Sequence, residues 1–521
     1  MRLFLSDFLR HFPALAAIIA VAAALRVYFF GGYIGLDDGE YTRFAYQMAQ
    51  DQFSINGYSG PAVFPLRIGV IFPASLTFRF FGFGEWSVVV YPFVISVLAL
   101  LLSYICASAL FSHRVGLIAA AFHAVLPLDV NSATVLLPDL AAAFYASLGV
   151  TAIVLLLRFP LENQAAVFTV GVCAGLAFGV SWLCKETVSY FALTCAVLIG
   201  TSLKRSPKSG TILLAGVTLG SLAVLLGEMI VYGNLTGDFM LRFHEIERNY
   251  RQWENSFFTE GSDFGWPKGS SRAVALIKRL FISGPTFLFL NSYFLFLPLV
   301  GLVAAIHAAY WKDRSFLIPS VWFITLFLMF NFSSSSVASY SPLPLFERYF
   351  YPILFPSIVL ASALLGKLMF QDQSVAREIR RERSFWGVLV ITLLLIFGGP
   401  YVYWGYRTPL TWTHEVRDIV HIVKPSSPFY SDILTLRMLE FFSGYPVQTS
   451  WIDFESINST GELKPGSMVM VNKRYIAWLD KNGGMWLSKR SGYRKHEFYD
   501  HPPQTWRRIY ESSNAVLYQL S

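Results

Sequence analysis

The amino-acid sequence predicts a mainly α-helical membrane protein of about eleven transmembrane helices, with amphipathic helices beside the membrane and a small α/β domain at the C-terminus. The first observation is composition: of 521 residues, 55% are hydrophobic and 14% are charged, against roughly 25% charged in an ordinary soluble domain. The second is the recurrence of apolar runs of about 20 residues, the length that crosses a bilayer. Together they exclude a soluble enzyme and a disordered protein, and four cysteines are too few for a disulfide scaffold.

Eleven apolar runs are predicted to span the membrane. No small-residue cleavage site follows the first run, so we expect a retained anchor rather than a cleaved signal peptide. The third run is short, and a re-entrant segment is the alternative for it. The predicted spans are 12–31, 86–111, 115–129, 139–158, 165–183, 186–203, 210–232, 281–311, 315–332, 348–366 and 385–404.

The positive charges predict the orientation. With the N-terminus in the cytoplasm, the basic loops 203–209, 312–314 and 377–383 all fall on the cytoplasmic side, where Lys and Arg accumulate in membrane proteins. The predicted cytoplasmic segments hold 14 Lys/Arg and 6 Asp/Glu, and this difference equals the whole net charge of +8. The charge therefore indicates topology and not a nucleic-acid partner. We expect an integral protein of the bacterial inner membrane, with the C-terminus outside the cytoplasm.

Two domains are predicted. Residues 1–404 form the transmembrane domain, with large outside loops at 32–85 and 233–280. Residues 405–521 form the extracytoplasmic α/β domain, which has strand-like runs at 468–471 and 514–520 and no apolar run long enough to span.

The second outside loop carries charges and aromatic residues at helical spacing between Arg242 and Trp253. This pattern predicts an amphipathic helix at the membrane interface, and contact with a sugar or a carrier phosphate is the alternative. His244 and Glu245 are too few for a metal site, since no second His or Cys pair stands at ligand spacing.

An acidic turn directly follows the first span. Asp37, Asp38 and Glu40 place three carboxylates within four residues at the membrane face. Such a cluster can raise a carboxylate pKa, or it can recruit a cation or a polar substrate. The structural alternative is that Asp37 or Asp38 caps the amphipathic helix predicted by the spacing of Tyr41 and Phe44.

Further motifs follow at the same membrane face. They are Phe64-Pro65-Leu66-Arg67, Leu137-Pro138-Asp139 at the start of the fourth span, Ser181-Trp-Leu-Cys-Lys185-Glu186 between the fifth and sixth, and Glu347-Arg348-Tyr349-Phe-Tyr-Pro352 at the tenth. With the acidic turn, this series resembles the integral-membrane (GT-C) glycosyltransferases, in the branch of the protein O-mannosyltransferases and lipid A aminoarabinose transferases. The acidic motif of that family reads D-E-x-x-Y; Asp37 and Tyr41 match it, and Asp38 stands where Glu is usual. The resemblance covers 10–205 and 340–366 best.

The resemblance implies a GT-C fold and a hexosyl- or pentosyltransferase. Such an enzyme moves a sugar from a polyprenyl-phosphate donor to an extracytoplasmic glycan, lipid or protein, with inversion at the anomeric carbon. The chemistry needs a general base for the acceptor and cations for the departing phosphate. The first acid of the family motif has the role of the base, so Asp37 is the predicted base here, with Asp38 as the alternative.

Candidate substrate-binding residues lie at the same face. Lys185 and Arg348 are predicted to stabilise the leaving phosphate, because a lone Lys at the end of an apolar span is costly without an anion and a guanidinium binds phosphate oxygens in pairs. For Lys185 the structural alternatives are snorkelling or pairing with Glu186, and for Arg348 they are pairing with Glu347 or anchoring at the membrane interface. For Asp139 the alternative is a helix cap, and for Tyr349 it is the aromatic belt. The remaining candidates are Glu40, Tyr41, Asp139, Glu186, Tyr349 and His244.

No cofactor or metal is predicted to be required, although the paired acids keep a divalent cation as an alternative. The Phe-rich run 287–296 is a candidate groove for an isoprenoid tail, with ordinary lipid-facing packing as the alternative. Two other functions fit the composition: a glycan polymerase or ligase, and a flippase of lipid-linked glycans. A flippase would show inverted repeats, and we find none in the sequence.

Overall fold

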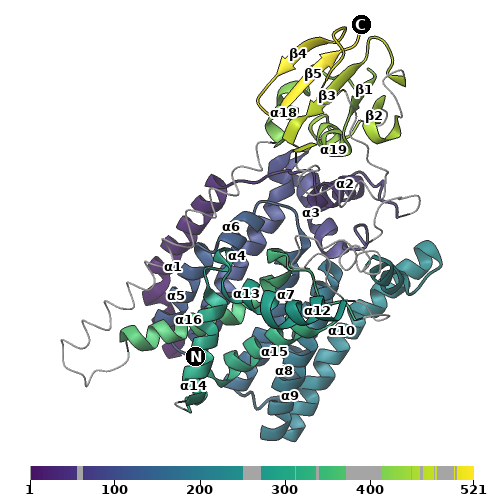
Figure 1. Cartoon of the computed structure of the whole chain (residues 1–521). Coiled ribbons are helices and arrows are strands. Elements are labelled where there is room, and N and C mark those ends of the chain that lie inside the picture. The colour runs from purple at the N-terminus through teal and green to yellow at the C-terminus, as the bar shows by residue number, and fades with distance from the viewer. Residues whose placement is uncertain are drawn as a thin grey trace.

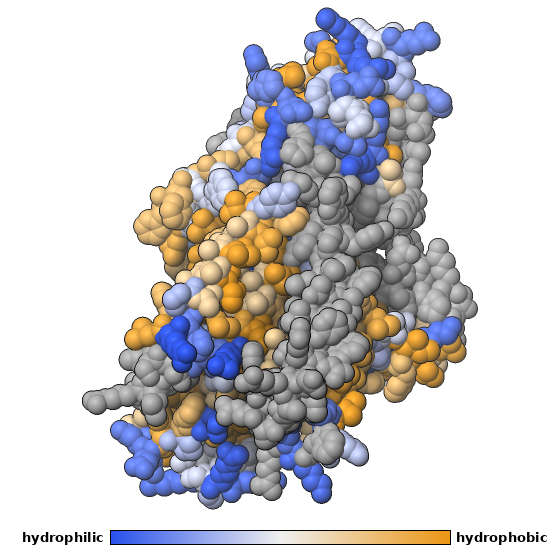
Figure 2. All heavy atoms as spheres, turned by 90° about the vertical axis from the view of Figure 1, so that its left-hand side faces the viewer, coloured by the Kyte–Doolittle hydropathy of each residue, from blue (hydrophilic) through white to orange (hydrophobic). Residues whose placement is uncertain are grey.

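The computed structural model describes the whole chain except residues 1, 56–62, 250–271, 311, 336–339, 371–411, 447–448, 458–461, 475, 478–497 and 499–500. Long helices form a bundle, and a small sheet domain stands at one end of it (Figure 1). The space-filling view shows an apolar zone across the middle of the molecule, with polar side chains gathered at both ends (Figure 2).

The bundle consists of helices of very different lengths. In chain order they are α1 (Arg2–Tyr28), α2 (Asp37–Ala49), α3 (Ile68–Phe81), α4 (Glu85–Leu110), α5 (His113–Ala124), α6 (Pro127–Ser132), α7 (Pro138–Arg158), α8 (Gln164–Cys184), α9 (Ala192–Arg205), α10 (Pro207–Thr236), α12 (Arg272–Lys278), α13 (Gly284–Phe289), α14 (Leu297–Tyr310), α15 (Leu317–Phe332) and α16 (Tyr351–Phe370). The 3-10 turns η1 (Glu186–Phe191), η3 (Ser292–Phe294), η4 (Arg314–Phe316) and η5 (Glu347–Phe350), and the π turn η2 (Arg279–Ser283), lie between them.

Seven helical segments of the described residues are long and apolar enough to cross a membrane: Leu9–Tyr28, Glu85–Leu110, Pro138–Arg158, Gln164–Cys184, Glu186–Arg205, Pro207–Thr236 and Glu347–Met369. Each coincides with one of the predicted spans. Helices α14 and α15 are apolar but shorter. The prediction of a mainly helical, polytopic membrane protein is confirmed.

Some predicted spans differ in local structure. The short run 115–129 covers most of α5, which ends at Ala124, and the first residues of α6. The prediction of one continuous span over 281–311 is wrong, because the chain breaks between α13 and α14, where Leu295 and Phe296 adopt positive φ. The predicted span 385–404 and the basic run 377–383 lie outside the described residues.

The Phe-rich run lies at this break and contributes to the protein core. Leu288 and Phe294 are buried, and the Phe287 ring lies 5.5 Å from that of Phe350, between centroids. A role for this run as an isoprenoid groove stays a prediction.

Small residues bring α8 and α10 into close contact. A Cβ at Gly175 would lie 2.2 Å from the carbonyl oxygen of Val217, and one at Gly220 would lie 2.4 Å from that of Val172. Membrane helices commonly pack through such small residues, which let the two backbones approach. The contact fixes the end of α8, beside which Lys185 stands.

The C-terminal domain is an α/β unit, as predicted. Its sheet has the order β2-β1-β3-β5-β4, in which β1 is parallel to β2 and β3, and β5 is antiparallel to β3 and β4. The elements are α18 (Trp412–Ile419), β1 (Phe429–Ser431), α19 (Ile433–Phe442), β2 (Trp451–Asp453), η7 (Phe454–Ser456), β3 (Met468–Asn472), β4 (Arg507–Glu511) and β5 (Ala515–Gln519). The strand-like runs 468–471 and 514–520 correspond to β3 and β5. The predicted domain boundary at 404 lies outside the described residues.

Candidate active site

The two aspartates of the acidic turn have different environments. The Asp38 carboxylate is buried and accepts hydrogen bonds from the backbone N–H groups of Ile34 (2.7 Å), Gly35 (3.2 Å) and Leu36 (2.9 Å). Burial raises the pKa of Asp38 to about 6, although these three bonds act in the opposite direction. Leu36 is the N-cap residue of α2, and no side chain caps that helix. Asp38 therefore holds together the turn before the helix.

Asp37, by contrast, faces the centre of the site. Its carboxylate lies 2.6 Å from Nη2 of Arg348, and its side chain is 36% exposed. Desolvation alone raises the pKa of Asp37, but Arg348, together with Arg67 and Lys185, outweighs it and lowers the pKa below its ordinary value. Asp37 is thus an ionised carboxylate that an incoming group can reach.

Asp139 and Lys185 extend this arrangement inward. Lys185 Nζ donates to Asp139 Oδ1 and lies 3.7 Å from the centre of the Tyr349 ring. The other carboxylate oxygen, Asp139 Oδ2, is 4.0 Å from Arg348 Nε and has no hydrogen-bond partner in the described part of the chain. Burial lowers the pKa of Lys185 to about 8, although the Asp139 carboxylate raises it.

Arg67 belongs to the Phe64-Pro65-Leu66-Arg67 motif, but the sequence predicted no role in the site for this residue. Its Nη2 lies 3.2 Å from Oε1 of Glu186, and its Nη1 donates to the Tyr41 hydroxyl. Arg67 is buried at the start of α3, after the Pro65-Leu66 segment. A signal was present, since Arg67 is a lone cation in an apolar stretch, the same argument that identified Lys185.

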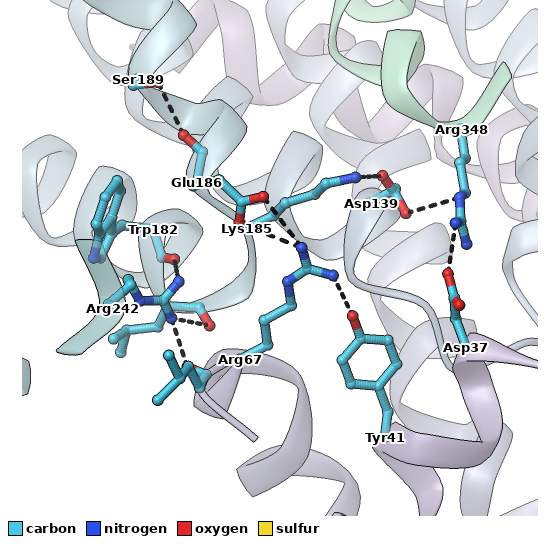
Figure 3. A network of polar contacts seen from close by, with 12 residues as sticks. Asp37, Tyr41, Arg67, Asp139, Trp182, Lys185, Glu186, Ser189, Arg242 and Arg348 are labelled. Carbon is cyan, nitrogen blue, oxygen red and sulfur yellow. Dashed lines mark hydrogen bonds and ion pairs between the residues drawn. The ribbon is translucent and has the colours of Figure 1, made fainter. Parts of the chain in front are cut away.

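The cluster brings three acids and three cations together from several parts of the chain: Asp37, Asp139 and Glu186 with Arg67, Lys185 and Arg348 (Figure 3). They come from α2, α7, η1, the start of α3, the residue after α8, and η5. The set is formally neutral. A phosphate that enters it can be bound only in competition with carboxylates that already occupy the cations.

The cations do not pair with their sequence neighbours, which was one of the structural alternatives. Lys185 pairs with Asp139 rather than Glu186, and Arg348 pairs with Asp37 rather than Glu347. Asp139 is a first-turn residue of α7, and the N-cap there is Leu137, without a side-chain cap. Among the described residues, no group of three His, Cys, Asp or Glu side chains could hold a metal ion.

Two predicted site residues lie apart from this cluster. Glu40 pairs with Arg437 of the C-terminal domain at 2.6 Å. His244 pairs with Asp238 at 2.8 Å, and its side chain is 62% exposed. Their predicted roles in substrate binding stay predictions.

Arg242, for which carrier-phosphate contact was an alternative, is buried beside the cluster. It lies 2.7 Å from Glu228 and donates to the backbone carbonyl of Leu66 at 2.6 Å. It also donates to the carbonyl of Trp182 at 3.0 Å (Figure 3). Arg242 therefore supports the chain on both sides of the site, before Arg67 and before Lys185.

Comparison with known proteins gives similarities in sequence and in fold. Residues 68–227 match the family model described as dolichyl-phosphate-mannose-protein mannosyltransferase. The crystal structure of ArnT from Cupriavidus metallidurans bound to undecaprenyl phosphate is similar over 97% of both chains, with 16% identity and a TM-score of 0.55. The apo oligosaccharyltransferase of Archaeoglobus fulgidus is similar over 83% of this chain and 64% of its own, with 13% identity and a TM-score of 0.52. No curated protein matches the sequence.

The chain therefore has the fold of the integral-membrane GT-C glycosyltransferases. The match of residues 68–227 to the mannosyltransferase family model agrees with the resemblance seen in the sequence, and the similarity to ArnT extends the agreement in fold to 97% of the chain.

Proposed function

We propose that this protein transfers a sugar from a polyprenyl-phosphate donor to an extracytoplasmic acceptor, with inversion at the anomeric carbon. The observation that carries the proposal is the contact of Asp37 with Arg348, inside a cluster that also holds Lys185 and Arg67. A carboxylate base and cations for a phosphate are the two requirements of such a transfer, and here they lie side by side. The similarity to an ArnT structure with bound undecaprenyl phosphate supports the donor class.

In the proposed reaction, Asp37 takes the proton from the acceptor hydroxyl or amine. The acceptor atom forms a bond to the anomeric carbon from the side opposite the phosphate, and the bond from that carbon to the phosphate oxygen breaks. The polyprenyl phosphate leaves with the electron pair. Arg348, Lys185 and Arg67 stabilise the charge that develops on its oxygens, and they do so most strongly in a site where water is scarce.

Donor binding has a consequence for the base. Arg348 is occupied by Asp37 at 2.6 Å, so a donor phosphate that takes over this guanidinium separates it from the carboxylate. Asp37 then loses its nearest cation and becomes a stronger base while the leaving group gains its partner. The donor thus activates the base that its own transfer requires.

Gene deletion and complementation test the proposal and reveal the acceptor in the same experiment. Mass analysis of envelope glycans in a deletion strain identifies the component that loses a sugar, and wild-type protein should restore it. Asp37→Asn should fail to restore it, since general-base catalysis typically contributes about 10²- to 10⁴-fold. Asp38→Asn, at equal protein level, is the matched control and should restore more than Asp37→Asn.

Two results would count against this proposal. Full restoration by Asp37→Asn removes that residue from the role of base. An unchanged glycan profile in the deletion strain, together with no transfer by purified wild-type protein in liposomes with polyprenyl-phosphate sugars, rejects the function. Transfer without an added metal stays a prediction, to be checked in the same liposomes with and without a chelator.

A further inference from the structure

Helix α19 of the C-terminal domain lies between the sheet and α2 (Figure 1). It packs on residues 33–40, which form the turn before α2 and the first turn of that helix. The Tyr33 ring stacks on Phe441, with centroids 4.0 Å apart and planes inclined by 5°. The Tyr33 hydroxyl donates to the backbone carbonyl of Arg437 at 3.2 Å, and the Arg437 side chain lies 2.6 Å from Glu40. These contacts flank Asp37 on both sides in sequence.

The turn between these contacts is shaped for close approach to α19. Gly35 has φ +84°, and a Cβ there would lie 2.9 Å from the Cγ atom of Met438. On its other side, the Tyr33 backbone N–H donates to Glu85 at 3.2 Å, and the same Glu85 oxygen accepts from Arg417 of α18 at 2.5 Å. Two helices of the C-terminal domain thus hold one turn.

Glu40 links α2 to α19 through an ion pair. It is 5% exposed, and Oε2 has no hydrogen-bond partner among the residues that the structure describes. Burying a carboxylate that pairs with one cation of another domain carries a desolvation cost. A gain in stability therefore does not explain this ion pair. Glu40 and Asp37 lie three residues apart on α2, so they are neighbours on the helix surface, and a shift of this helical turn moves both.

We propose that α19 is a positioning element for the base: Arg437 through Glu40, and Phe441 through Tyr33, hold Asp37 in place against Arg348. This inference rests on the proposed function of Asp37. It makes Glu40 a positioning residue and not a substrate ligand. The cations for the donor phosphate stand on other elements, so loss of the contact should affect turnover more than donor binding.

The double variant Glu40→Gln/Arg437→Met tests the proposal. It removes both charges at once, so no unpaired carboxylate is left buried and the domain can still dock. We expect kcat to fall about 10- to 100-fold, as for a displacement near 1 Å. The donor KM should stay within about twofold, since the phosphate contacts are retained. Arg437→Lys, which keeps the charge, should retain most of the wild-type kcat.

Arg508→Met is the matched control, because it breaks an exposed ion pair with Glu511 in the same domain, away from the turn. It should leave kcat unchanged. A second readout is the rate of backbone hydrogen exchange in residues 33–41, measured without substrate. This rate should rise in the double variant and stay at the wild-type value in the control.

The outcomes separate the two proposals. Wild-type kcat and exchange in the double variant overturn the positioning role and leave the proposed function intact. A proportional loss of donor binding also overturns it, because the whole site would then have been disturbed. If the wild-type protein transfers no sugar, the proposed function fails, and hydrogen exchange at 33–41 still decides whether α19 holds the turn.

Discussion

Asp37 and Asp38 are adjacent, yet their surroundings give them different chemistry. Asp38 is buried and bound by three backbone N–H groups, whereas Asp37 is partly exposed and paired with a guanidinium. Two carboxyl groups whose environments move their pKa values apart usually have separate roles. This separation supports the proposal that Asp38 has a structural role and that Asp37 takes the proton.

The pH dependence of transfer should report the Asp37–Arg348 pair. The acidic limb of kcat/KM reflects the base of the free enzyme, which must be ionised. Arg348 lowers the pKa of Asp37 against desolvation, which raises it, so in Arg348→Gln the pKa rises and the acidic limb moves to higher pH. The measurement is kcat/KM across the acidic and neutral pH range, with Arg508→Gln as the control. An acidic limb at the same pH in Arg348→Gln and wild type would contradict the pairing.

The lowered pKa of Lys185 predicts a second pH effect, on the donor KM at basic pH. Because burial lowers its pKa to about 8, Lys185 is charged at about pH 7 and largely neutral at about pH 9. The donor KM should therefore rise several-fold, at most about 10-fold, between these pH values. In Lys185→Arg the guanidinium stays charged, so the rise should disappear. If both proteins show the same rise, Lys185 does not bind the phosphate.

The candidate site was predictable from sequence where a single charged residue has an unusually high free-energy cost in its apolar surroundings. Asp37, Asp139, Lys185 and Arg348 each place a charge at the end of an apolar run, and the structure brings all four together. The partner of each charge was not predictable, because it comes from another helix. The pairing of Glu40 with Arg437 is the clearest case, since it depends on how the C-terminal domain docks.

At the scale of elements, hydropathy located the membrane helices but not their interruptions. The run 281–311 is apolar throughout, so its composition predicts one helix. The break at Asn291–Phe296 depends on a side-chain cap from Asn291 and on two residues with positive φ, and neither changes the mean hydropathy. The contact between α8 and α10 was likewise not predictable from the sequence, because a glycine allows close packing only where another helix lies against it.

That helix contact gives a stability prediction with a control on the same helix. Gly220→Ala would place Cβ 2.4 Å from the carbonyl oxygen of Val172, whereas a Cβ at Gly227 meets nothing within 4 Å. Gly220→Ala should therefore destabilise the protein by about 1–3 kcal/mol through overpacking. Gly227→Ala should be neutral, or stabilising by up to about 1 kcal/mol through helix propensity. Thermal unfolding in detergent measures both, and equal melting temperatures would disprove the close packing.

At the scale of the whole molecule, the arrangement suits the proposed reaction between a membrane-bound donor and an acceptor outside the cytoplasm. The charged cluster includes Asp37 on α2, the helix that α19 of the C-terminal domain contacts (Figure 1). The cluster therefore lies at the end of the helical bundle where that domain stands. A carrier with an isoprenoid tail can stay in the bilayer while its phosphate reaches Lys185 and Arg348. In the proposed reaction, the acceptor approaches from the side of the C-terminal domain.

This geometry makes the orientation of the chain a decisive prediction, because an extracytoplasmic acceptor requires the C-terminal domain to lie outside the cytoplasm. Single cysteines at two exposed positions test it in a background without Cys106, Cys173, Cys184 and Cys195. Ser456→Cys lies in the C-terminal domain, and Ser206→Cys lies between α9 and α10, among the positive charges Lys204, Arg205 and Lys208. A membrane-impermeant maleimide should label Ser456→Cys in intact cells, and should label Ser206→Cys only after the membrane is opened. Labelling of both in intact cells would place the basic loop outside, against the charge rule, while labelling of Ser206→Cys alone would invert the protein and put the proposed active site in the cytoplasm.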